Sequence, residues 1–292
     1  MLVIDCHAHI YSPDEERYPP AARPLRVPGG GGSIQDLRAV MHANGVAAVR
    51  AIQTVSFYGY DNRYLADVSR ANPGRVSGVC TLDPDDPRSP EILWRLVQEH
   101  GVKSLRSIPA ESRTRFDHPA VRRLWQAAHE LGITVDIFLM QLEWVEGAER
   151  LLREFPHLTV AFCHCLDLKP GEEYRKKLEA VLRLARFPNL IAKVDFISTG
   201  TAKGFPGDDL HEAALKIIGA YGAERCVWGS NYPNRLWTPR MSYEEHLRIF
   251  REVLPLKEED RRQILGETAR RLWFPDIGEG TSLSPSHPRI GG

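Results

Sequence analysis

The chain has 292 residues, 42% of them apolar and 26% charged, so it can bury the core of one large barrel or of two ordinary domains. Its 38 Lys and Arg balance 38 Asp and Glu, and this zero net charge argues against a protein that coats nucleic acid or an anionic membrane. We therefore expect no nucleic-acid and no membrane partner, and the longest apolar runs are too short to cross a bilayer. The N-terminus has no basic segment, and Asp5 and His7 interrupt its apolar run, so we expect a cytoplasmic protein.

Eight short β-rich runs recur along the chain, and segments with helical periodicity fill the gaps between them. Several helical segments open at capping residues, such as Ser33, Ser89 and Ser242, and others close at Gly, as at Gly101. This alternation predicts a parallel sheet covered by helices, and eight units in about 275 residues match a (β/α)8 TIM barrel. A doubly wound open sheet is the alternative, although no Gly-x-Gly-x-x-Gly follows the first run. The eight runs are Leu2–Cys6, Val46–Gln53, Arg75–Leu82, Val102–Ile108, Ile133–Leu139, Leu158–His164, Leu190–Phe196 and Cys226–Ser230.

Two segments fall outside this alternation. Pro19–Ser33 is a Pro- and Gly-rich loop after the first run, which predicts mobility, and it is either a lid over the carboxyl end of the barrel or a surface insertion. Asp276–Gly292 is rich in Gly, Ser and Pro, which predicts a disordered tail. We therefore expect one domain over residues 1–275 and a tail over residues 276–292.

Candidate metal ligands follow the first run directly. His7 and His9 are two residues apart, so on an extended chain they point to the same face. Two neutral imidazoles from one rigid strand end make half of a Zn²⁺ or Mn²⁺ site. His164 ends the sixth run and would lie at the same end of the barrel, whereas in isolation it reads as a core histidine with a satisfied hydrogen bond.

Other polar residues also lie at strand ends. Lys193 and Asp195 share one face of the seventh run, either as an ion pair that closes the interior or with Asp195 as a catalytic carboxylate. Asn231 ends the last run, and its amide can bind a metal weakly or bind substrate but cannot accept a proton as a base. Arg106 offers a guanidinium to a substrate carboxylate or pairs with Asp136 inside the barrel.

Gln53 and Tyr58 lie at the end of the second run and in its loop, and they are candidates for orienting a substrate. This loop and four other strand ends resemble the amidohydrolase superfamily, specifically its amidohydrolase-2 branch, and the similarity extends to about Phe274. The segments that carry the resemblance are Ile4–His9, Gln53–Asn62, Gly101–Arg106, Pro188–Lys193 and Glu224–Pro233.

That branch contains lactonases of the fuconolactonase and pyrone-dicarboxylate lactonase type, together with aminocarboxymuconate semialdehyde and resorcylate decarboxylases. The resemblance implies a metal-dependent (β/α)8 enzyme with His7, His9 and His164 as ligand positions. Zn²⁺ is the first expectation and Mn²⁺ the second, and metal-free operation stays open because some lactonases of this branch work without a metal. The aspartate that the family carries on its last strand falls on Asn231, which departs from the pattern.

We therefore predict the hydrolysis of a lactone or related small cyclic carboxylate by metal-activated water. Asp195 would accept the proton in place of Asn231, and Arg106 would hold a substrate carboxylate. The alternatives are a metal-dependent decarboxylase of an unsaturated or aromatic acid, and a non-catalytic barrel that binds a small acid. Asn231 favours the binding barrel, and the intact histidine set argues against it. Assembly into a homo-oligomer is compatible with such barrels.

Overall fold

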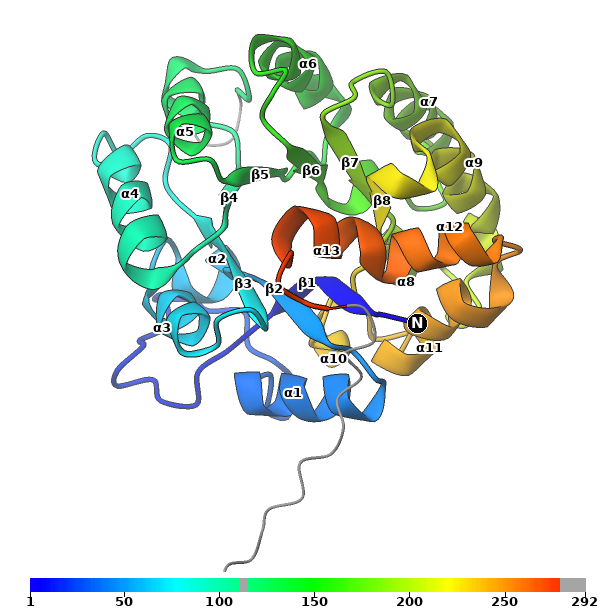
Figure 1. Ribbon diagram of the computed structural model, residues 1–292, viewed down its shortest axis with the longest axis horizontal. Helices are drawn as coiled ribbons and strands as arrows, with labels where there is room; N and C mark the ends of the chain where they lie inside the picture. The colour runs from blue at the N-terminus through cyan, green and yellow to red at the C-terminus, as the bar shows by residue number, and fades with distance from the viewer. Residues whose placement is uncertain (111–114, 279–292) are drawn as a thin grey trace, which may run out of the picture.

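The computed structural model describes residues 1–110 and 115–278, in which eight parallel strands form a barrel surrounded by helices (Figure 1). Each strand is hydrogen-bonded to the next along the chain, from β1 to β8, so the predicted (β/α)8 TIM barrel is confirmed and the open doubly wound sheet is excluded. The strands are β1 Ile4–His9, β2 Ala48–Ile52, β3 Val76–Thr81, β4 Ser104–Ser107, β5 Thr134–Ile137, β6 Val160–Phe162, β7 Leu190–Lys193 and β8 Cys226–Val227.

The barrel closes where the chain after β8 meets β1. The N–H of Cys6 donates to the carbonyl of Trp228 at 3.0 Å, and the N–H of Asn231 donates to the carbonyl of His7 at 2.8 Å. Glycine is required at position 229, because a Cβ there would lie 2.6 Å from the Cβ of His7. This close approach fixes the position of His7 relative to the end of the last strand.

Helices cover the outside of the barrel, and no helix within residues 1–110 and 115–278 is long and apolar enough to span a membrane. Ser33 and Ser242 cap α1 and α11 as predicted, whereas Ser89 is itself the first residue of α4 and donates to the carbonyl of Asp83. Gly101 ends α4 with φ +68°, the left-handed conformation that favours glycine. The α-helices are α1 Ile34–Ala43, α2 Val55–Tyr58, α3 Arg63–Ala71, α4 Ser89–His100, α5 Pro119–Glu130, α6 Val145–Glu154, α7 Tyr174–Leu184, α8 Phe196–Gly200, α9 His211–Tyr221, α10 Asn234–Trp237, α11 Tyr243–Arg248, α12 Glu258–Arg262 and α13 Thr268–Trp273.

The two segments outside the predicted alternation are the loop Pro19–Ser33 and the C-terminal segment Asp276–Gly292. The loop Pro19–Ser33 lies against the chain after β2, where the N–H of Leu25 donates to the carbonyl of Ser56 at 2.8 Å, and its mobility stays a prediction. Ile277 is buried in a cluster with Ile4 of β1 and Trp273 of α13, and the domain boundary at residue 275 stays a prediction. The rest of the expected tail, residues 279–292, lies outside the described residues.

Three of the buried charged side chains form one cluster in the barrel interior. Arg50 of β2 binds Asp136 of β5 through both oxygens, at 2.6 and 3.1 Å, and the ammonium of Lys193 lies 2.5 Å from the same carboxylate. Burial alone would raise the pKa of Asp136, but Arg50 and Lys193 outweigh it and lower this pKa to about 2. Lys193 therefore pairs with Asp136 and not with Asp195, and Asp136 is held by Arg50 and Lys193 and not by Arg106 as the sequence allowed.

Asp5 fastens β1 to the chain after β8. Its carboxylate accepts the N–H groups of His7 and Ser230 at 3.0 and 2.9 Å, and the hydroxyls of Ser230 and Tyr243 at 2.6 and 3.1 Å. Complete burial nevertheless raises its pKa to about 6 from 3.8, because the hydrogen bonds offset only part of the desolvation. The folded protein therefore binds this proton more tightly than the unfolded chain does.

It follows that the stabilisation from the protonated Asp5 is fully present below about pH 4 and is lost as the pH rises through 6. We expect the free energy of unfolding to fall by on the order of 3 kcal/mol more in the wild type than in Asp5→Asn over that range. Urea unfolding at pH 4, 5, 6 and 7 measures the difference. Parallel pH profiles for the two proteins would contradict this assignment.

Candidate active site

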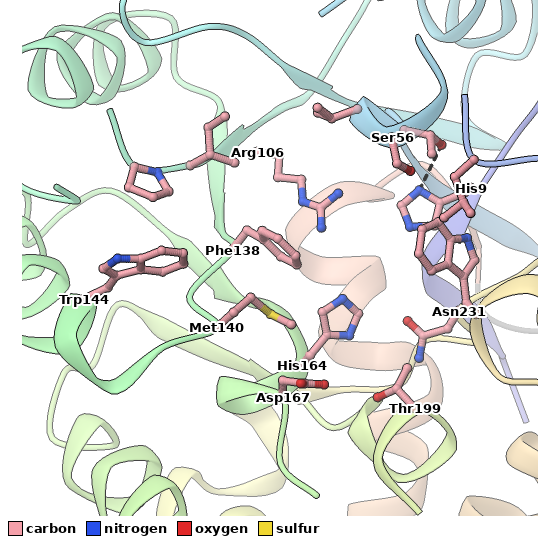
Figure 2. A pocket seen from close by; sticks show the side chains of 16 residues that line it. His9, Ser56, Arg106, Phe138, Met140, Trp144, His164, Asp167, Thr199 and Asn231 are labelled. Atoms are coloured by element: carbon pink, nitrogen blue, oxygen red, sulfur yellow. Dashed lines mark hydrogen bonds between the residues drawn. The ribbon is translucent and has the colours of Figure 1, made fainter. Parts of the chain in front are cut away.

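A cavity of about 600 Å³ opens at the carboxyl end of the barrel, where the loops after the strands meet (Figure 2). Its volume lies in the range of clefts that bind small molecules. Polar side chains at its floor come from β1, from the turn after β6 and from the chain after β8: His9, His164 and Asn231. These are the strand ends at which catalytic residues of TIM-barrel enzymes lie.

A buried group of possible metal ligands lies at and beneath this floor. Ligand atoms of His7, His164 and Asp195 all lie within 4.8 Å of one another, and the two imidazole rings are 4.5 Å apart between centroids. The carboxylate of Asp195 lies 3.5 Å from Nδ1 of His7 and 3.4 Å from Nδ1 of His164. Two imidazoles and a carboxylate form a donor set that suits Zn²⁺ or Mn²⁺.

The unmet hydrogen-bonding capacity of this group fits a cation. Among the described residues, Nε2 of His7, Nδ1 of His164 and Oδ2 of Asp195 are buried and have no hydrogen-bond partner. Buried polar atoms ordinarily have hydrogen-bond partners, so three such atoms without partners on side chains that lie next to one another need an explanation. A divalent cation between them would satisfy the lone pairs that the protein leaves open.

His9 is the next ligand position along β1, and it faces the cavity. Its Nδ1 lies 3.0 Å from the carbonyl of Ile52 and 3.2 Å from the hydroxyl of Thr54, which anchors the ring and directs its other edge away from β2. The rings of His7 and His9 are 5.1 Å apart between centroids. The structure therefore groups Asp195 with His7 and His164, and it places His9 beside this group.

Both histidines of β1 are held in the neutral form. Burial lowers the pKa of His7 well below its usual value, and the nearby charge of Lys193 lowers it further. Burial also lowers the pKa of His9, with Arg106 as the second cause. A neutral imidazole keeps a lone pair for a metal, so these environments favour ligation.

His164 lies in a strained turn directly after β6. The sequence predicts a strand through His164, but β6 ends at Phe162, and residues 164–167 all have positive φ, between 43° and 64°. Non-glycine residues in this conformation cost on the order of 1–3 kcal/mol each, and such strain gathers at functional sites. The carboxylate of Asp195 supports the turn by accepting the N–H of His164 at 3.1 Å.

Asn231 also has a positive φ, of 57°, and its side chain is hydrogen-bonded to the loop after β7. Its Nδ2 donates to the carbonyl of Asp195 at 2.9 Å and to the hydroxyl of Ser198 at 3.2 Å. The amide oxygen points into the cavity (Figure 2). An aspartate at this position would place a carboxylate oxygen against the Asp195 carbonyl, so the local geometry favours the amide.

Arg106 is the predicted substrate contact that the structure brings to the cavity. Its guanidinium lies 4.0 Å from the centre of the Phe138 ring and points toward the middle of the cavity (Figure 2). Gln53 and Tyr58 do not line this cavity. Gln53 donates to the carbonyls of Gly59 and Asp61, and the Tyr58 hydroxyl accepts the N–H of Ser12, so both hold neighbouring loops in place.

Several cavity residues were missed by the sequence analysis. Phe138, Met140 and Trp144 follow β5, and Trp237 lies in α10 with its ring 5.4 Å from that of His9. Phe138 and Met140 closely follow β5, which was the available signal, whereas Trp144 and Trp237 lie farther along their loops. Nothing in the sequence distinguishes them from residues that pack under the helices.

The comparisons with known proteins agree with this architecture. A family model described as "Amidohydrolase" matches residues 4–274. A provisionally named 2-pyrone-4,6-dicarboxylic acid hydrolase from Pseudomonas putida has a similar structure, with a TM-score of 0.77 and 24% identity over 95% of this chain and 99% of that one. Among curated proteins, none matches this chain.

Two further structures with other bound groups or activities share the fold. An amidohydrolase from Burkholderia multivorans with bound zinc gives a TM-score of 0.72 at 19% identity over 93% of this chain and 99% of that one. A 5-carboxyvanillate decarboxylase from Sphingomonas paucimobilis gives 0.67 at 17% identity over 93% and 98%. At such identities these likenesses show a common fold.

Proposed function

The chain belongs to the amidohydrolase family, and from this membership we propose that it is a metal-dependent hydrolase of a lactone or a related small cyclic carboxylate. The observation that carries the proposal is the buried group of His7, His164 and Asp195, whose open lone pairs lie at and beneath the floor of the cavity. The hydrolase and zinc-containing neighbours support the same chemistry.

His7, His164 and Asp195 would hold the cation, with His9 next to them at the cavity floor. We propose Zn²⁺ first and Mn²⁺ second, since both accept imidazole and carboxylate ligands. When bound, a divalent cation supplies a Lewis acid that polarises a carbonyl and lowers the pKa of a water to about 7. The carboxylate of Asp195 would offset part of the cation's charge.

We assign the proton-accepting role to Asp195. Hydrolysis joins a water oxygen to the ester carbon and breaks the ring C–O bond, and one water proton passes to the departing alkoxide. Asn231 cannot carry that proton. Oδ2 of Asp195 has no hydrogen-bond partner among the described residues, so it could hold the cation through one lone pair and accept the proton on another. Asp195 is fully buried, and the residues next to it that line the cavity floor are His164 and Asn231.

Arg106 would orient the substrate by its carboxylate. We expect Arg106→Gln to raise KM for 5-oxotetrahydrofuran-2-carboxylate about tenfold to a hundredfold, because a charge-assisted hydrogen bond is lost. γ-Butyrolactone has the same ring without the carboxylate, and its KM should change by less than about twofold. Equal losses for the two lactones would show that Arg106 does not bind the carboxylate.

Product analysis tests the reaction type. Incubation of the protein with these lactones should release a proton and the open-chain hydroxy acid, which a pH indicator and NMR detect. Release of CO₂ from unsaturated or aromatic acids, without lactone opening, would instead identify a decarboxylase like the neighbour from Sphingomonas paucimobilis. Binding of small acids with neither product would identify the non-catalytic barrel.

A further inference from the structure

The two ends of the cavity differ in their polar groups. His9 and Asn231 lie beside Trp237 at the end formed by β1 and the chain after β8, whereas Ile108, Met140 and Trp144 follow β4 and β5. In an eight-stranded barrel, β4 and β5 lie across the mouth from β8 and β1. Figure 2 shows Trp144 on the side away from His9 and Asn231, with Arg106 and Phe138 between them.

The end formed by the loops after β4 and β5 is an apolar wall, made of Ile108, Pro109, Phe138, Met140 and Trp144. Ile108 and Trp144 are buried and held by packing, whereas Phe138 and Met140 are partly exposed, so the wall is a fixed surface with partly exposed side chains that a ligand can cover. One face of Phe138 is occupied by the guanidinium of Arg106. An anionic group at Arg106 would therefore lie at the boundary between the polar floor and the apolar wall.

The reacting group and the carboxylate of a small lactone occupy only the floor and Arg106. The cavity of about 600 Å³ continues beyond them along the apolar wall. Apolar protein surface that stays in contact with water adds nothing to the binding free energy. A ligand that covers this surface gains about 25 cal/mol of binding free energy per Å². The wall therefore favours a ligand with an apolar part on the far side of its carboxylate.

We propose that the substrate of this enzyme carries an apolar ring or alkyl chain that lies on the apolar wall, and that Trp144 and Met140 determine specificity for it. The substrate class is an alkyl- or aryl-substituted cyclic ester, and not an unsubstituted small ring. This inference rests on the proposed function for the chemistry at the floor, but its binding prediction requires no turnover.

The test is calorimetric binding of linear carboxylates from propionate to nonanoate, which present one carboxylate and a growing apolar chain. Affinity should rise about fourfold per methylene while the chain stays on the wall. Trp144→Ala and Met140→Ser should each weaken nonanoate binding about tenfold or more and change propionate binding by less than about twofold. Trp94→Ala removes an exposed tryptophan of α4 outside the cavity and serves as the matched control.

An affinity that stays flat from propionate to nonanoate would overturn the inference, as would an equal loss for both acids in Met140→Ser. That variant keeps the test decisive if Trp144→Ala does not fold. A protein that opens γ-butyrolactone but shows a flat series has the proposed function without this specificity. A protein that binds nonanoate through Trp144 and Met140 but opens no lactone has the apolar site without the proposed function.

Discussion

Asp195→Asn is expected to lower kcat/KM for a lactone by about 10²- to 10⁴-fold with little change in stability. The amide has nearly the shape of the carboxylate, and its oxygen can still accept the N–H of His164, which now lies at 3.1 Å. It cannot accept a proton, and it brings no negative charge to the two histidines at 3.5 and 3.4 Å. Steady-state kinetics and thermal unfolding, run on the same preparation, measure the two effects.

Asp167→Asn is the matched control for this substitution. Asp167 lines the same cavity from the turn after β6, but it lies outside the buried group of His7, His164 and Asp195. Its carboxylate pairs with the exposed Lys169 at 2.9 Å. We expect kcat/KM to change by less than about threefold in this variant. If Asp195→Asn turned over substrate as fast as the wild type, Asp195 would not be the proton acceptor.

Asp136→Asn is expected to lower the free energy of unfolding by about 3–5 kcal/mol. The substitution leaves Arg50 and Lys193 fully buried with no carboxylate between them. Because the folded protein holds the pKa of Asp136 at about 2, below the unfolded value of 3.8, this stabilisation is present above about pH 4 and is lost as the pH falls through 2. Urea unfolding at pH 7 therefore measures it in full.

Glu91→Gln provides the comparison for the buried pair. Glu91 pairs with Arg95 one turn along α4, and both side chains are more than half exposed. Removing that pair should cost less than about 1 kcal/mol, since solvent screens exposed ion pairs. A similarly small loss in Asp136→Asn would show that Arg50 and Lys193 find other partners in the barrel interior, as Arg50 already does in the hydroxyl of Ser104.

The barrel could be predicted because its signals are local. Each predicted β-rich run overlaps an observed strand, and Gly101 ends its helix in the conformation that its position in the sequence indicates. The spacing of His7 and His9 likewise places both at the carboxyl end of β1. Even so, β1 begins two residues later than expected and continues to His9, with a shift in its register against β2.

The features that the sequence did not determine depend on contacts across the barrel. Lys193 and Asp195 lie at the same strand end, but the ammonium of Lys193 pairs with Asp136 from β5. The side-chain amide of Gln53 donates to the carbonyls of Gly59 and Asp61 in the loop after β2, so it holds this loop and does not face a substrate. Sequence spacing gives the face of a strand, whereas these choices are made by side chains that are distant along the chain.

The metal content per chain shows whether His7, His164 and Asp195 hold a cation. Elemental analysis should use protein purified without chelator or nickel resin, alongside His7→Ala and the exposed control His42→Ala. We expect close to one Zn²⁺ or Mn²⁺ per chain in the wild type and in His42→Ala, and loss of the metal in His7→Ala. Wild-type protein without metal, or equal metal in His7→Ala, would contradict it.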